Sequence, residues 1–153
     1  MEISGIDHVG VTTGDMERAK RFYGDVLGLT LRGEGEDSWP GLGRLTGLDG
    51  ARIRWAEYDL GSGQILEVLQ YLTPEGRPLS QQPNDPGSAH LALATDDVHA
   101  LHAHLMRSGV VVRSPAPVLI DEQGEWKGYL CLYAEDPDGF TVEFVQPPPL
   151  SAR

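Results

Sequence analysis

Two histidines of this chain stand at matched places in a repeated pattern. The segment "HVGVTTGDM" (8–16) aligns with "HLALATDDV" (90–98), so that His8 lies over His90 and apolar positions lie over apolar positions. Histidine is an unusual residue in a strand that otherwise alternates for burial, because each ring nitrogen needs a hydrogen-bond partner or a ligand. The recurrence at the same place in both halves favours a functional imidazole over a core histidine.

Two glutamates repeat in the same way. The segment "ILEVLQ" (65–70) aligns with "TVEFVQ" (141–146), which places Glu67 over Glu143. A carboxylate within an apolar strand is costly to bury without a partner. A metal ion would supply that partner, and two imidazoles with two carboxylates suit a divalent first-row metal. We therefore predict one divalent ion per subunit, with Ni, Co, Mn, Zn, Fe and Mg all left open.

Small residues accompany both histidines. Side chains alternate along a strand, so His8 shares a face with Gly10, and His90 shares a face with Ala92 and Ala94. These neighbours leave open space beside the imidazoles. The pattern is more typical of a cavity lining than of a packed core.

The elements that position these residues also repeat. In the first half we expect a strand and a helix, the helix beginning after Asp15 and ending at Gly28, followed by two strands joined by the turn "DLGSGQ". The second half repeats the order after a proline-rich linker. The expected strands are 3–12, 51–59, 64–71, 88–95, 110–113, 128–135 and 140–146; the second helix is 97–108; the segments 34–50 and 114–127 are expected to be irregular.

Length and charge limit the kinds of partner. A chain of 153 residues fits one domain, with module one at about 1–72, the linker at about 73–87 and module two at about 88–147. The net charge of −11 would repel nucleic acid and anionic membrane surfaces. The single cysteine, Cys131, excludes an intrachain disulfide and suits a reducing compartment. With no signal peptide or membrane span visible, a cytoplasmic location is predicted.

Beyond the repeat, the chain resembles the vicinal oxygen chelate superfamily, which includes glyoxalase I, methylmalonyl-CoA epimerase, ring-cleaving dioxygenases, and fosfomycin and bleomycin resistance proteins. The resemblance rests on "DHVGVTTGDMERAKRFYGDVLGL", "ILEVLQY", "AHLALATDDV" and "DPDGFTVEFVQP". It implies an α+β fold of two tandem βαβββ modules, whose curved mixed sheets form a cup around one metal. The implied ligands are His8, Glu67, His90 and Glu143, and a homodimer is implied, with the modules paired within or between chains.

The ligand count separates the activities that the resemblance implies. Oxygen-activating members usually use two histidines and one carboxylate, whereas this chain offers a second carboxylate at Glu67. Bleomycin-binding relatives are expected to lack the metal ligands altogether. The prediction is therefore an epimerase, isomerase or glyoxalase-type lyase that moves a proton next to a carbonyl, with Glu67 or Glu143 as the base. The alternatives are a drug- or metabolite-binding protein without turnover and a non-haem iron dioxygenase.

Between the proton-transfer enzymes the sequence leaves the choice open. Glyoxalase I shares the set of two histidines and two glutamates. Methylmalonyl-CoA epimerase usually has Gln where Glu67 stands, and it carries a second catalytic glutamate in the preceding strand. A rough alignment puts Arg52 or Arg54 near that position and Glu57 further along, out of reach. A sugar-like or cyclitol hydroxyketone epimerase would suit the same site, and Arg54, Trp126 and Tyr133 are candidate contacts to a small-molecule substrate.

Overall fold

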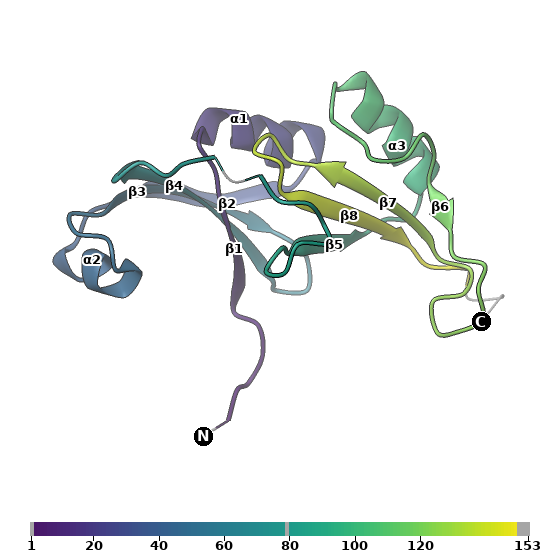
Figure 1. The fold of residues 1–153 in the computed structure, drawn as a ribbon, viewed down its shortest axis with the longest axis horizontal. Coiled ribbons are helices and arrows are strands. Elements are labelled where there is room, and N and C mark those ends of the chain that lie inside the picture. The colour runs from purple at the N-terminus through teal and green to yellow at the C-terminus, as the bar shows by residue number, and fades with distance from the viewer. Residues whose placement is uncertain (1, 79, 150–153) are drawn as a thin grey trace. The chain divides into compact units, whose positions relative to one another are not determined.

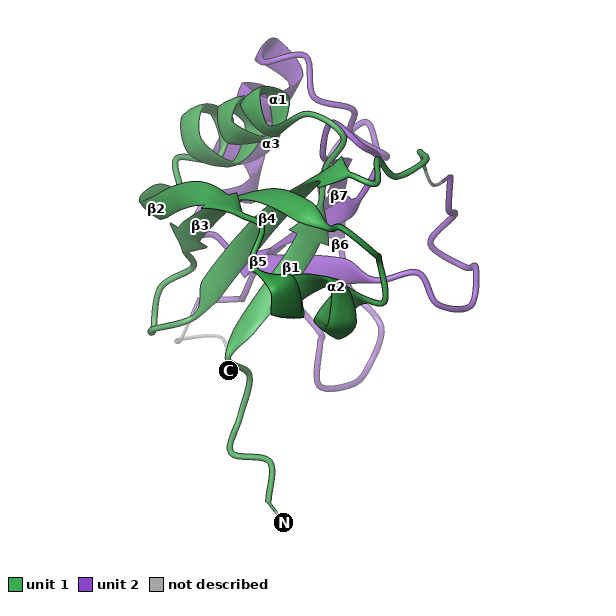
Figure 2. Ribbon diagram, turned by 90° about the vertical axis from the view of Figure 1, so that its left-hand side faces the viewer, with its two compact units in different colours: residues 1–79 green, residues 80–153 purple. Residues whose placement is uncertain are grey.

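A computed structural model describes residues 2–78 and 80–149 of the chain. The chain divides into two compact units, residues 1–79 (unit 1) and residues 80–153 (unit 2), which Figure 2 colours green and purple. The boundary between the units falls inside the predicted linker.

Unit 1 is a four-stranded mixed sheet with a helix between its first two strands. Its sheet order is β1-β4-β3-β2, with β1 parallel to β4 and the other neighbours antiparallel. The elements are β1 (His8–Thr12), α1 (Met16–Lys20), the π-helix η1 (Arg21–Val26), β2 (Thr30–Asp37), α2 (Pro40–Thr46), β3 (Arg52–Asp59) and β4 (Ile65–Thr73) (Figure 1).

Unit 2 repeats this arrangement. Its sheet order is β5-β8-β7-β6, and β5 runs parallel to β8 as β1 does to β4. The elements are β5 (His90–Ala94), α3 (Val98–Arg107), β6 (Val118–Leu119), β7 (Leu130–Glu135) and β8 (Thr141–Gln146). The predicted α+β fold of two βαβββ modules is confirmed.

The helices α1 and α3 each begin at a capping aspartate. The Asp15 carboxylate accepts a hydrogen bond from the Arg18 N–H at 3.1 Å, and Asp97 accepts one from the Ala100 N–H at 2.8 Å. Each bond satisfies one of the N–H groups that the first turn of a helix leaves without an internal partner. The repeated aspartates therefore set where each helix starts.

The repeated glutamines tie each helix to its sheet. The Gln70 side chain accepts from the Met16 N–H at 3.2 Å and donates to the Gly14 carbonyl at 3.0 Å. Gln146 accepts from the Val98 N–H at 2.9 Å in the second unit. The alignment of these glutamines in the two halves thus reflects a shared link between the last strand and the helix N-terminus.

The two faces of each sheet differ in composition. One face packs against α1 or α3 and carries the buried core, which includes Ala56, Tyr58, Leu66 and Val68 in unit 1 and Leu132, Ala134, Val142 and Phe144 in unit 2. The residues between them point to the opposite face, here called the site face. The site face of unit 1 carries Glu57 and Glu67, and that of unit 2 carries Tyr133 and Glu143.

The N-terminal part of the predicted strand 3–12 is wrong, because pairing with β4 begins only at His8. Residues 2–7 lie off the sheet and extend away from it (Figure 1). Ile3 and Ile6 are 90% and 70% exposed there, so their alternation with polar residues does not reflect burial. Strand pairing, and not the apolar pattern, determines where β1 starts.

The segment 34–50 is not irregular, as the sequence had suggested. It contains the end of β2 and the helix α2, which starts at Pro40 and ends at Gly47 with φ 73°. Proline suits the first helical position and glycine the left-handed cap, so both signals were present. The buried Leu42 packs α2 against the sheet face opposite α1 (Figure 1).

The predicted strand 110–113 is reduced to one bridge between Val112 and Ala134. The strand that completes the second sheet is β6, within the segment 114–127 that was expected to be irregular. Pro115 and Pro117 lack backbone N–H groups, which restricts the ladder in this region to two residues.

Within residues 2–78 and 80–149, no helix has the length and apolar character needed to span a bilayer.

Tyr58 should make unit 1 sensitive to alkali. Its side chain is 1% exposed, and burial, followed by nearby carboxylates led by Glu34, raises its pKa above the usual value of about 10. The folded state then keeps a proton that the unfolded chain releases, so the stability is present below about pH 10 and declines as the pH rises further. Between pH 8 and pH 11, urea unfolding should show a smaller loss of stability in Tyr58→Phe than in the parent. Equal losses would contradict this assignment.

Candidate active site

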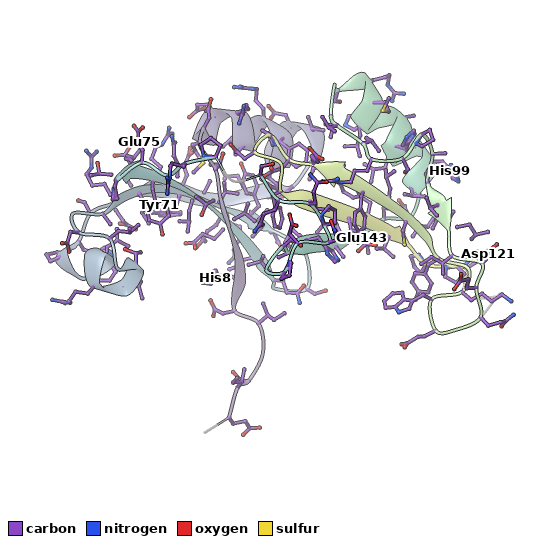
Figure 3. The ribbon with its side chains drawn as sticks, viewed as in Figure 1. His8, Tyr71, Glu75, His99, Asp121 and Glu143 are labelled. Carbon is purple, nitrogen blue, oxygen red and sulfur yellow. The ribbon has the colours of Figure 1, made fainter. Side chains whose placement is uncertain are left out.

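The first histidine and glutamate meet on the site face of unit 1. Gly10 of β1 pairs with Glu67 of β4, so His8, two residues earlier, lies diagonally across from that carboxylate. The His8 Nε2 and Glu67 Oε2 atoms are 3.5 Å apart. Figure 3 labels His8 on β1 of unit 1. It also labels Glu143 on β8 of unit 2, the residue that corresponds to Glu67.

The second pair has the same construction in unit 2. Ala92 of β5 pairs with Glu143 of β8, and the His90 Nε2 and Glu143 Oε2 atoms are 3.2 Å apart. The Glu143 side chain is only 16% exposed, a degree of burial that favours a cationic partner. Parallel pairing of the first and last strands of each module therefore produces the same histidine–glutamate pair twice.

The geometry of each pair fits two donors on one ion. Donor atoms that each bind an ion at about 2.1 Å lie roughly 3.0–3.4 Å apart, close to the separations of the two pairs. The Asp7 carboxylate lies 2.8 Å from His8 Nδ1 and leaves Nε2 directed toward Glu67. This hydrogen bond, followed by the charge of Glu67, raises the pKa of His8 above its usual value despite partial desolvation.

Among residues 2–78 and 80–149, no group of three or more His, Cys, Asp or Glu side chains could hold a metal ion. Each unit holds one histidine–glutamate pair, and the four-residue ligand set stays a prediction from the sequence.

Glu57 lies beside the first pair, and the expectation that it is out of reach is wrong. The antiparallel register of β3 and β4 pairs Glu57 directly with Glu67, so both carboxylates point to the site face. The charge of Glu57 also contributes to the raised pKa of His8. The tight turn between the strands brings position 57 level with 67, which the rough alignment missed.

Unit 2 has a tyrosine where unit 1 has Glu57. Tyr133 pairs with Glu143 across β7 and β8, and its ring centroid lies 5.6 Å from that of His90. Burial, followed by the charge of Glu143, raises the pKa of Tyr133, which keeps the phenol protonated. Cys131 also faces this site, and its thiol donates a hydrogen bond to the Glu143 carboxylate. Burial, followed by the charge of Glu143, raises the pKa of this thiol.

The other two predicted substrate contacts each have a partner within their own unit. Arg54 lies on the helix face of its sheet, where its guanidinium is 2.9 Å from Glu17 of α1. The alternation that brings Glu57 to the site face takes Arg54 away from it. Trp126 is 57% exposed and packs edge-on against Tyr129 at 5.1 Å between ring centroids.

Arg113 is a site-face residue that the sequence did not single out. Its backbone N–H donates to the Tyr133 carbonyl at 2.9 Å, and its guanidinium lies 2.9 Å from Glu135. The sequence around position 113 has no pattern that predicts a site-face residue. Arg113 reaches this face because the neighbouring Val112 forms a bridge with Ala134 of β7. The two units thus present different chemistry around equivalent pairs, acidic in unit 1 and phenol with guanidinium in unit 2.

Comparison with known proteins identifies the family. The sequence model of the Glyoxalase/Bleomycin resistance protein/Dioxygenase superfamily matches residues 5–144. The chain belongs to this superfamily. The resemblance seen in the sequence is therefore confirmed, and the match covers both histidine–glutamate pairs.

Similar proteins within the superfamily include two enzymes. The chain is 29% identical over 149 residues to a 2-epi-5-epi-valiolone epimerase from an Actinomyces species, covering 94% of this chain and 79% of that protein. It is 28% identical over 142 residues to the lactoylglutathione lyase of Haemophilus influenzae, covering 91% and 90%. A glyoxalase family protein from Bacillus cereus has the same fold, with a TM-score of 0.82, 19% identity and 97% coverage of both chains.

Proposed function

We propose that this protein is a metal-dependent enzyme that moves a proton at a carbon next to a carbonyl. The substrate is a small molecule with vicinal oxygens, and the reaction is an epimerisation, an isomerisation or a glyoxalase-type lyase reaction. The observation that carries this proposal is the repeated histidine–glutamate pair, with donor atoms 3.5 and 3.2 Å apart. Similarity to an epimerase and to a lactoylglutathione lyase supports the same reaction class.

The residues proposed to hold the ion are His8, Glu67, His90 and Glu143. A divalent ion bound there would supply Lewis-acid stabilisation of the negative charge that develops on substrate oxygen. A homodimer and a cytoplasmic location are also part of the proposal.

The proton is carried by carboxylates. Glu143 and Glu67 are the bases proposed from the sequence, and Glu57 joins them because it lies level with Glu67 on the site face. A carboxylate oxygen takes the proton from the carbon, and the C–H electron pair moves toward the carbonyl oxygen. Return of a proton to the same carbon from the other side inverts it, whereas return to the neighbouring carbon isomerises the substrate.

Deuterium exchange tests the proposal. Protein loaded with a divalent metal is incubated in D₂O with α-hydroxyketones, a hemithioacetal and an acyl-CoA thioester, and C–H exchange is followed by NMR. We expect exchange with at least one of these substrates, and a loss of about 10²–10⁴-fold in Glu143→Gln. Binding without exchange across the panel would indicate a sequestering protein, and oxygen consumption by iron-loaded protein would indicate a dioxygenase; either result contradicts the proposal.

A further inference from the structure

Trp55 occupies the site face of unit 1 beside the carboxylates. It lies two residues before Glu57 on β3, so both side chains project from the same face. The indole is partly exposed and is not part of the buried core on the helix side. A large aromatic side chain at this place is therefore available to a molecule that reaches Glu57.

Two glycines of β2 provide the floor on which the indole lies. Gly33 pairs with Glu57 and Gly35 pairs with Trp55. A Cβ built on Gly35 would lie 3.0 Å from the indole Cζ2, and one on Gly33 would lie 3.6 Å from Cζ3. The ring thus extends over both glycines, against bare backbone, and a side chain at 35 would push it outward.

An apolar cluster adjoins the indole on the side away from the carboxylates. Leu69 pairs with Trp55 across β4 and packs, with Tyr71, against the cluster of Leu42, Ala51 and Ile53. Along β3 the site face therefore changes from an aliphatic residue at 53 to an indole at 55 and a carboxylate at 57. Successive site-face residues are separated by about 6.6 Å, so this row matches the width of one six-membered ring with its substituents.

The charge of this face disfavours anions. At the site-face positions of β1, β3 and β4 in the described residues of unit 1 there is no Lys or Arg, whereas Glu57 and Glu67 are both present. Both arginines of β3 form ion pairs with glutamates. Arg54 lies 2.9 Å from Glu17 of α1, and Arg52 lies 3.6 Å from Glu36 of β2. A phosphate or carboxylate on the substrate would meet like charge here.

We propose that Trp55 is the substrate platform of this site and that it selects a neutral, ring-shaped polyol ketone. The C–H face of the ring lies on the indole, whose π face carries negative charge, and the hydroxyl groups donate to the carboxylates beside it. This inference rests on the proposed proton transfer and narrows its substrate class. It adds Trp55 as a binding residue and the Gly33–Gly35 pair as the support that sets the height of the indole.

A fluorescence titration tests binding without requiring turnover. In a Trp39→Phe and Trp126→Phe background, Trp55 is the only tryptophan and reports on its own surroundings. The ligands are a neutral keto-cyclitol, dihydroxyacetone, dihydroxyacetone phosphate and catechol. We expect saturable quenching by the keto-cyclitol, with affinity about tenfold or more above that for the other three. Equal or tighter binding of the phosphate or of catechol would overturn the proposed substrate class.

Three further variants test the platform itself. In the tryptophan-containing protein, Trp55→Ala should reduce the preference for cyclic over acyclic ketones about tenfold, measured as the ratio of kcat/KM in deuterium exchange. Gly35→Ala should weaken keto-cyclitol binding because it displaces the indole. Gly76→Ala is the matched control, because a Cβ at this exposed loop glycine would meet nothing within 4 Å. An unchanged preference in Trp55→Ala would overturn the platform.

The outcomes separate this inference from the proposed function. If exchange occurs with dihydroxyacetone alone and the keto-cyclitol neither binds nor exchanges, the proton transfer stands and the platform is wrong. If the keto-cyclitol quenches Trp55 but no substrate exchanges, the platform stands and the proton-transfer function is wrong.

Discussion

Replacing both His8 and His90 by alanine is expected to abolish metal binding. Each substitution removes one donor from a pair, and the remaining carboxylates, Glu67 and Glu143, would each lose the neighbour within 3.5 Å. Loss of groups that merely orient ligands costs about 10–100-fold in affinity, so loss of two direct ligands should exceed about 100-fold. Elemental analysis after dialysis, together with a competition assay against a chelator, measures the effect.

The single variants and a control make the result specific. His8→Ala and His90→Ala should each weaken binding, because the proposed site needs both units. His99 is an exposed histidine on α3, labelled in Figure 3, and His99→Ala should leave the metal content unchanged. A double variant that still holds one ion per chain would show that this ligand set is wrong.

Glu57→Gln is expected to lower the rate of epimerisation by about 10²–10⁴-fold, the usual contribution of a positioned base. The amide keeps the size of the side chain, so the β3–β4 hairpin and the pairing with Glu67 should persist. Metal content should stay within twofold of the parent (a rough tolerance), because Glu57 is not among the proposed ligands. The rate of interconversion is followed by polarimetry or NMR on the substrate found in the exchange panel.

A neighbouring acidic residue provides the control for this experiment. Asp37 is exposed at the end of β2 in the same sheet, and Asp37→Asn removes the same charge without touching the pair with Glu67. This substitution should change the rate by less than about twofold, because the charge of Asp37 acts on the site only through solvent, where dissolved salt screens it. If Glu57→Gln behaves like this control, Glu57 is not a base.

Local chemistry in the sequence determined the repeat and much of the secondary structure. Asp15 and Asp97 start the helices, and the shared positions of Gln70 and Gln146 follow from their bonds to the helix N-termini. These interactions join residues to nearby backbone or to a repeated partner, so they leave a pattern that can be aligned. The fold class and the matched positions of the histidines and glutamates were predictable for that reason.

Which residues surround each pair was decided by strand register and by packing between elements. Glu57 reaches Glu67 only because the hairpin pairs them, and the same alternation turns Arg54 toward α1. Trp55 becomes a surface over Gly33 and Gly35 because β2 pairs beside it, in a segment without a clear strand pattern. Sequence alone determined that a histidine and a glutamate recur at matched positions, since the repeat can be aligned. Tertiary structure decided which side chains meet, since strand pairing joins distant residues and a register shift of one residue would reverse every side chain.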